Sequence, residues 1–114
     1  MGDIKKSALW DHRPEDPPSG SFNFTVSLNG DMVKYGPDIR RFVDAMVFKL
    51  EKNASKGRWE GYNMSEAFGL LEKEVAELLA EVNSDRNTIK VTLEAADVAN
   101  FALIIAAMAI EGRR

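Results

Sequence analysis

The tightest limit on the fold comes from an apolar segment near the end of this 114-residue chain. Residues 98–110 read VANFALIIAAMAI, so that a helix in this segment would be apolar on nearly every side. The helical pattern begins near Thr88 and stops before Gly112, a residue that commonly ends helices. A helix that is apolar all round must be buried all round. We therefore expect a long central helix over residues 88–110, covered by other helices and by a partner subunit.

Two more helices are predicted upstream of this segment. From Pro37 to about Asn53, apolar residues recur every three or four positions, and proline is favoured in the first turn of a helix. A second helix is predicted to start at Ser65, a common N-cap residue, and to run to about Val82. The stripe that we expect it to turn toward the core is Leu71, Val75, Leu78, Leu79 and Val82. Because short connections place successive helices antiparallel, the predicted fold is an all-α antiparallel bundle completed by oligomerisation.

The first 36 residues follow a different pattern. Three prolines within residues 1–20 disfavour regular structure and indicate a loose arm. The next residues, FNFTVSL, alternate apolar and polar side chains and lead into Asn29-Gly30, a pair typical of a two-residue β-hairpin. We therefore divide the chain into an arm with a β-hairpin, residues 1–36, and a helical core, residues 37–114.

Composition excludes several classes of function. The net charge is −3 with acidic and basic residues interspersed, which disfavours a nucleic-acid partner. Without cysteine, and with His12 as its only histidine, the chain cannot build a thiol site or a zinc site of the usual kind. The N-terminus carries no signal-peptide pattern, and the stretch from Val98 to Ile110 is too short to span a bilayer. We expect a cytoplasmic protein with no membrane partner.

Two acidic residues on the long helix carry the chemical information. Asp97 falls in the middle of an apolar stripe, and Glu94 lies one turn before it on the same side. The stripe consists of Leu93, Phe101, Ile104, Ile105 and Met108. Two carboxylates that face a core are costly unless a positive charge offsets them. An ion pair with a lysine or arginine of another helix would do so, and a divalent cation is the other solution.

The preceding helix carries two acids at the same spacing, Glu74 and Glu77. Taken alone, these two and Glu81 are typical of a solvated helix face. On antiparallel neighbouring helices, however, the two pairs can bring four carboxylates to one point. Such a set of hard oxygen ligands without histidine or cysteine suits Mg²⁺, with Mn²⁺ as a possible substitute.

The two segments LLEKEVAELLAEV and TLEAADVANFALIIAAM together resemble the metal-binding core of the MazG-like pyrophosphohydrolases, within the all-α NTP pyrophosphatase superfamily. The similarity covers residues of about 37–112, and KNASKGRW resembles a segment of phage-encoded members. It implies that Glu74, Glu77, Glu94 and Asp97 are the catalytic acids and the Mg²⁺ ligands. It also implies hydrolysis of nucleoside triphosphates, with deoxynucleotides the expected class, to the monophosphate and pyrophosphate, by a homodimer or homotetramer. It leaves the role of residues 1–36 open.

Five further residues are candidates for binding the substrate. Lys52, Lys56 and Arg58 could accept the phosphates, although they also fit a plain solvated loop. Trp59 could stack on the base or anchor its loop to the core, and Asn100 could order a ligand or bond a neighbouring helix.

The chain contains no G-x-x-x-x-G-K-[ST] pattern and no covalent nucleophile paired with a base, so a water activated by a metal is the simplest attacker. The alternative to the enzyme is a non-catalytic helical dimerisation or adaptor module. In such a module the same acids form a solvated face and an ion pair.

Overall fold

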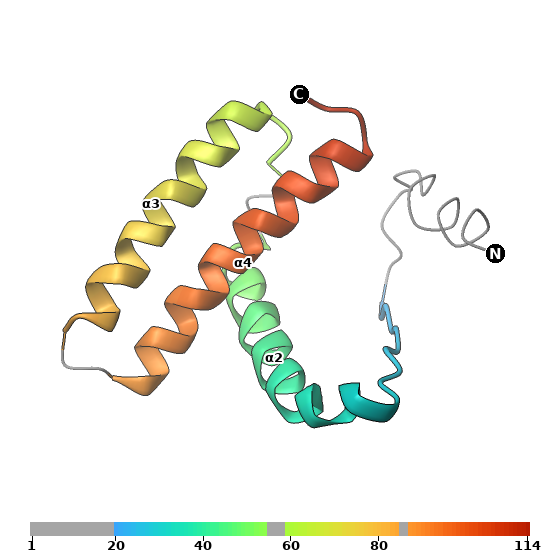
Figure 1. The fold of residues 1–114 in the computed structure, drawn as a ribbon. Coiled ribbons are helices and arrows are strands. Elements are labelled where there is room, and N and C mark those ends of the chain that lie inside the picture. Colours follow the sequence, from blue (N-terminus) through green and yellow to red (C-terminus); the bar gives the residue numbers. More distant parts are fainter. Residues whose placement is uncertain (1–19, 55–58, 85–86) are drawn as a thin grey trace.

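The computed structural model describes residues 20–54, 59–84 and 87–114. These form a 3₁₀ helix, η1 (Gly30–Tyr35), and three α-helices, α2 (Gly36–Lys52), α3 (Met64–Val82) and α4 (Thr88–Ile110) (Figure 1). Within these ranges there is no strand. The predicted all-α class is confirmed.

Helix α4 is the central element. It packs against α3, which runs antiparallel beside it, and against α2, which crosses it (Figure 1). Its bounds are those that the sequence predicts. The Asn87 side chain accepts a hydrogen bond from Lys90 N at 3.1 Å and so caps its first turn. Beyond its last turn, Gly112 takes a φ of +75°, which glycine adopts without strain, and Arg113 N donates to Met108 O at 2.8 Å.

The start of helix α3 corrects one prediction, because Asn63 and not Ser65 is its N-cap. Asn63 has an extended backbone, and its side chain accepts from Glu66 N at 2.8 Å. The Glu66 side chain accepts in turn from Asn63 N at 3.0 Å. Asparagine caps as well as serine does, and only Asn63 has a glutamate three residues later to close this reciprocal capping box.

The orientation of α3 corrects a second prediction. Leu71 and Leu78 are half-buried, but Val75, Leu79 and Val82 are 47%, 60% and 45% exposed. Glu74 is half-buried in the position that the apolar stripe was expected to fill. In this chain alone, α3 therefore turns the edge of its stripe and one acid toward α4, while the middle of the stripe stays uncovered.

The predicted β-hairpin is wrong. Residues 21–29 form no regular element, and Asn29-Gly30 leads into η1 instead of a hairpin turn. Asn29 keeps an extended backbone and precedes the first 3₁₀ turn, in which Met32 N donates to Asn29 O at 3.1 Å. A lone hairpin is marginal in water, and Phe22 and Phe24 lie 74% and 72% exposed, so this segment is not packed closely enough to support one.

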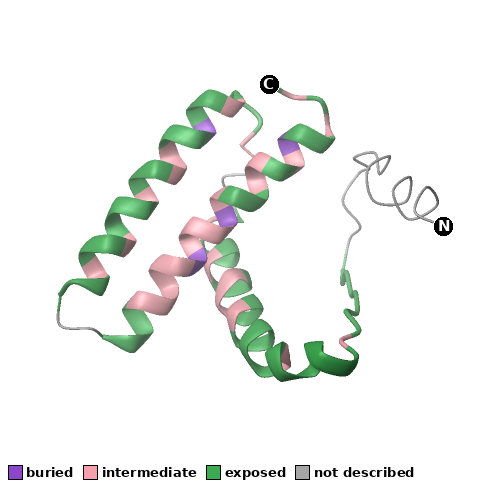
Figure 2. Ribbon diagram, viewed as in Figure 1, coloured by how far each residue is buried: buried purple, intermediate pink, exposed green. Residues whose placement is uncertain are grey.

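Little of the described chain is fully buried. The buried residues are Ala67, Ala96, Asn100 and Met108 (Figure 2). Helix α4 is also long and apolar enough to cross a membrane by length and composition alone, a test that core helices of soluble proteins pass too. Its polar Asp97 and Asn100 side chains contact α2, through Lys49 and Met46 O respectively. The core of the single chain thus lies along the inner side of α4.

Candidate metal centre

Three carboxylates meet between helices α3 and α4. Glu74 from α3, and Glu94 and Asp97 from α4, each offer one oxygen, and these oxygens all lie within 4.8 Å of one another. All three residues are half-buried. The antiparallel packing of the two helices brings the acids together, because residues three apart on a helix share a side. The arrangement fits the bonding needs of a hard divalent cation.

Two of these carboxylates have an oxygen without a partner. Oε2 of Glu74 and Oε2 of Glu94 are shielded from solvent and accept no hydrogen bond from the described residues. A buried polar atom that makes no hydrogen bond is costly, more so when it carries charge. These two oxygens therefore fit a cation as their missing partner.

The pKa values of the cluster also show that its negative charge is not fully compensated. The pKa of Glu74 is raised from 4.5 to about 7. Burial is the largest cause, followed by a hydrogen bond with the Glu77 side chain and by the charges of Glu77, Asp97 and Glu94. The pKa of Glu94 is also raised, chiefly by burial and by the charges of Asp97 and Glu77, while Lys49 acts in the opposite direction. Near neutral pH the cluster thus holds a proton on Glu74 or needs another positive charge.

Asp97 has a partner of its own. Lys49 Nζ, from helix α2, lies 3.2 Å from Asp97 Oδ2, and both side chains are largely shielded, at 22% and 16% exposure. The ion pair that the sequence left open as an alternative to a metal is therefore present. One lysine offsets one of the three carboxylates, so it leaves most of the negative charge of the cluster in place.

Glu77 borders this cluster without belonging to its three-oxygen group. It is exposed on α3, and it acts on both Glu74 and Glu94 through its charge. Glu81, which the sequence assigned to a solvated face, is half-buried and also acts on Glu94. Of the four predicted ligands, the structure brings together Glu74, Glu94 and Asp97.

A cavity of about 90 Å³ opens beside the carboxylates. Its lining combines two acids, one lysine, two asparagines and four apolar or aromatic side chains: Lys49, Leu50, Asn53, Trp59, Glu74, Asp97, Asn100, Phe101 and Ile104. All three helices and the segment before α3 contribute to it. The cavity therefore joins the acidic cluster to a mixed polar and aromatic wall.

The two asparagines of this wall have a fixed orientation. Asn100 Nδ2 donates to Met46 O at 3.1 Å, and Asn53 Nδ2 donates to Lys49 O at 3.0 Å. A backbone carbonyl only accepts, so the amide nitrogen of each side chain must face helix α2. Asn100, which is 6% exposed, is left with a buried Oδ1 that has no partner among the described residues. The hydrogen bond to a neighbouring helix, which was the alternative role predicted for Asn100, is confirmed. Its Oδ1 remains as an acceptor without a donor among the described residues.

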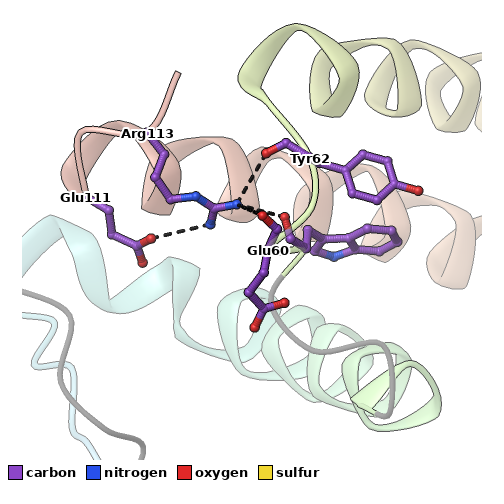
Figure 3. Close-up of polar contacts among 5 residues, drawn as sticks. Glu60, Tyr62, Glu111 and Arg113 are labelled. Carbon is purple, nitrogen blue, oxygen red and sulfur yellow. Dashed lines mark hydrogen bonds and ion pairs between the residues drawn. The ribbon is translucent and has the colours of Figure 1, made fainter.

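Trp59 forms the aromatic part of the wall. Its ring centroid lies 5.3 Å from that of Phe101 and 5.1 Å from that of Tyr62, in the second case edge to face. The ring thus anchors its loop to α4 and also lines the cavity. Arg113 reaches the same loop from beyond α4 (Figure 3).

The predicted phosphate-binding residues are placed only in part. Lys52 Nζ lies 4.8 Å from the centroid of the Phe48 ring, and Lys52 is not among the residues that line the cavity. Lys56 and Arg58 lie outside the described residues. The basic residue that lines the cavity is Lys49, which the sequence did not single out because lysines near a helix end are usually solvated. Asn53 and Arg113 were missed as well, since no spacing pattern marks them.

Comparison of the chain with models of protein families, with curated proteins and with solved structures gives no match.

Proposed function

We propose that the chain is a Mg²⁺-dependent nucleoside triphosphate pyrophosphohydrolase of the MazG-like kind. The observation that carries this proposal is the pair of buried, unpartnered oxygens on Glu74 and Glu94, within 4.8 Å of an Asp97 oxygen. Mg²⁺ favours carboxylate oxygens and phosphate oxygens together, so the donor set matches the cation and the substrate class. The resemblance of the two acidic segments to the family supplies the bond that is cleaved.

Glu74, Glu94 and Asp97 would hold the cation, which supplies charge for phosphate oxygens and lowers the pKa of bound water. Glu77, exposed beside Glu74, is the carboxylate best placed to orient a water molecule or take its proton. Lys49 lines the cavity next to Asp97 and would offer its ammonium group to a phosphate oxygen there. The predicted Lys52, Lys56 and Arg58 remain candidates for the outer phosphates.

The part of the cavity lined by Trp59 and Asn100 suits the base of a nucleotide. Trp59 offers an aromatic ring, and Asn100 Oδ1 offers a buried acceptor whose orientation is fixed from behind. An acceptor of this kind is satisfied by an N–H group, which every nucleobase carries on an edge or an amino group. We therefore place the base beside Trp59 and Asn100 and the phosphates toward the carboxylates.

Assembly is part of the same proposal. Val75, Leu79 and Val82 form an exposed apolar line on α3, and Leu103 and Ile110 are exposed on α4. We propose a homodimer or homotetramer built through these faces.

Product analysis tests the reaction. With Mg²⁺ in ¹⁸O-labelled water, a deoxynucleoside triphosphate should give monophosphate and pyrophosphate. Glu94→Gln keeps the side-chain shape and should lower kcat by at least about a hundredfold, whereas Glu72→Gln, exposed on the same α3 helix, should leave it within twofold. Diphosphate plus orthophosphate as products would refute the proposed reaction.

The adaptor module is the second candidate, and a specific observation favours it. The Lys49–Asp97 ion pair already offsets one acid without a metal, and the exposed apolar faces suit binding to a partner. The absence of turnover across common and modified triphosphates, with no heat of Mg²⁺ or Mn²⁺ binding, would decide for the module.

A further inference from the structure

The segment after helix α4 is hydrogen-bonded to the loop that carries Trp59. Arg113 Nη2 lies 2.8 Å from Trp59 O, 3.2 Å from Glu60 O and 3.3 Å from Tyr62 O (Figure 3). Arg113 Nη1 lies 3.4 Å from Glu111 Oε1 in an ion pair whose two side chains are 28% and 11% exposed. One half-buried guanidinium thus joins three carbonyls of residues 59–62 to the end of α4.

A second contact ties the same two segments together. Met64 N, at the start of α3, donates to Arg114 O at 2.9 Å. The turn at Gly112, with its φ of +75°, directs the chain back toward α3 and brings Arg113 and Arg114 to this loop. Residues 111–114 therefore act as a clamp between the ends of α3 and α4.

The backbone conformation of Trp59 requires contacts of this kind. Its φ is +62°, a left-handed backbone conformation that is unfavourable for a residue with a bulky side chain. Strained residues of this kind persist only where surrounding contacts fix them. The shortest hydrogen bond of the Arg113 guanidinium is to the carbonyl of Trp59 itself. In this conformation the indole ring lies against Phe101 and lines the cavity beside Asp97 and Asn100.

We propose that Arg113 is a positioning residue, which holds the backbone of Trp59 so that the indole ring forms the wall on which a nucleobase stacks. The inference rests on the proposed function for its ligand, a nucleoside triphosphate. The Arg113 side chain pairs with Glu111, away from the carboxylates of Glu74, Glu94 and Asp97, and it does not line the cavity. Its loss therefore acts on binding of the base and spares the metal centre. Lysine cannot replace it, because an ammonium group lacks the planar array of donors that reaches several carbonyls and a carboxylate at once.

The test compares Arg113→Ala and Arg113→Lys with Arg114→Ala, all in a Trp10→Phe background so that Trp59 is the sole indole. Arg114 is the matched control, because its backbone oxygen accepts the hydrogen bond from Met64 N and its side chain is exposed. Both Arg113 variants should raise KM for the triphosphate at least about fivefold with kcat within twofold. They should also shift Trp59 emission to longer wavelength and increase its quenching by acrylamide. Arg114→Ala should change none of these.

A double-mutant comparison separates positioning from a general loss of structure. In a Trp59→Ala background, Arg113→Ala should raise KM by less than about twofold, because the ring that it positions is gone. An equal increase in both backgrounds, or an unchanged emission and KM in Arg113→Ala, would overturn the inference. If the parent protein turns over no triphosphate, the proposed function fails, and the Trp59 emission and quenching alone then decide whether Arg113 holds the ring.

Discussion

Replacing Glu74 by glutamine gives a sharp test of the acidic cluster, because the change removes one charge and keeps the shape. The pKa of Glu74 is raised from 4.5 to about 7, and one pKa unit corresponds to about 1.4 kcal/mol. In the metal-free chain above pH 7, the ionised group therefore costs at most about 3–4 kcal/mol of folding free energy, and screening by solvent lowers this to about 1–2 kcal/mol. Glutamine avoids this cost, and its amide can still donate to Glu77.

The sign of the effect depends on pH. A carboxyl group whose pKa is raised by folding contributes stability below its unfolded pKa, here near 4.5, and this contribution is lost as the pH rises through 7. In EDTA, Glu74→Gln should match the parent protein at pH 4 and be more stable at pH 8. The gain should be about 1–2 kcal/mol, or roughly 4–8 °C in Tm. Millimolar Mg²⁺ or Mn²⁺ should stabilise the parent protein and leave the variant nearly unchanged.

Thermal and urea unfolding at both pH values provide the measurements, with Glu72→Gln as the control on the exposed side of α3. A variant less stable than the parent protein at pH 8 in EDTA would show that the charge of Glu74 is already compensated. The argument for a cation at this cluster would then fail.

Two other predictions concern the ion pair and the exposed apolar faces. Lys49→Met should lower the free energy of unfolding in EDTA by about 1–3 kcal/mol, because it leaves Asp97 unpaired beside two other acids. Mg²⁺ should restore much of this loss. Unchanged urea unfolding in EDTA would contradict the role of the ion pair. In light scattering, the protein should have the mass of a dimer or a larger assembly. Leu79→Lys, at a side chain that is 60% exposed, should shift it toward the monomer because it places a charge on the apolar face. A stable monomeric parent protein would refute the proposed assembly.

Local patterns in the sequence predicted the helices and most of the acidic cluster. The bounds of α4 follow from an apolar run that ends before Gly112, and α2 follows from its three-and-four spacing and Pro37. The approach of Glu74 to Glu94 and Asp97 was predictable because a short connection forces α3 and α4 to run antiparallel. Each of these inferences needed only a period or a cap within one or two elements.

What the sequence did not predict depends on how the elements meet. Lys49 pairs with Asp97 through the crossing of α2 and α4, and no periodicity within either helix defines that crossing. The contact of Arg113 with the Trp59 loop joins residues 54 positions apart through a turn beyond α4. The hairpin prediction failed for the related reason that alternation in FNFTVSL requires a partner strand or close packing on a surface. The described residues contain no strand, and Phe22 and Phe24 stay exposed although their segment shares an open cavity with α2.

The Lys49–Asp97 ion pair and a metal site are compatible because one lysine is too little charge for this cluster. Lys49 forms its ion pair with Asp97. The pKa values of Glu74 and Glu94 are raised, and these are the two acids with an unpartnered oxygen. A proton can occupy this remaining acidic site at low pH, and a divalent cation can do so near neutral pH. Protons and metal therefore compete for the same oxygens, so that apparent metal affinity should rise with pH up to about 7. A cluster that served only as a structural ion pair would be complete with Lys49 and would show no such competition.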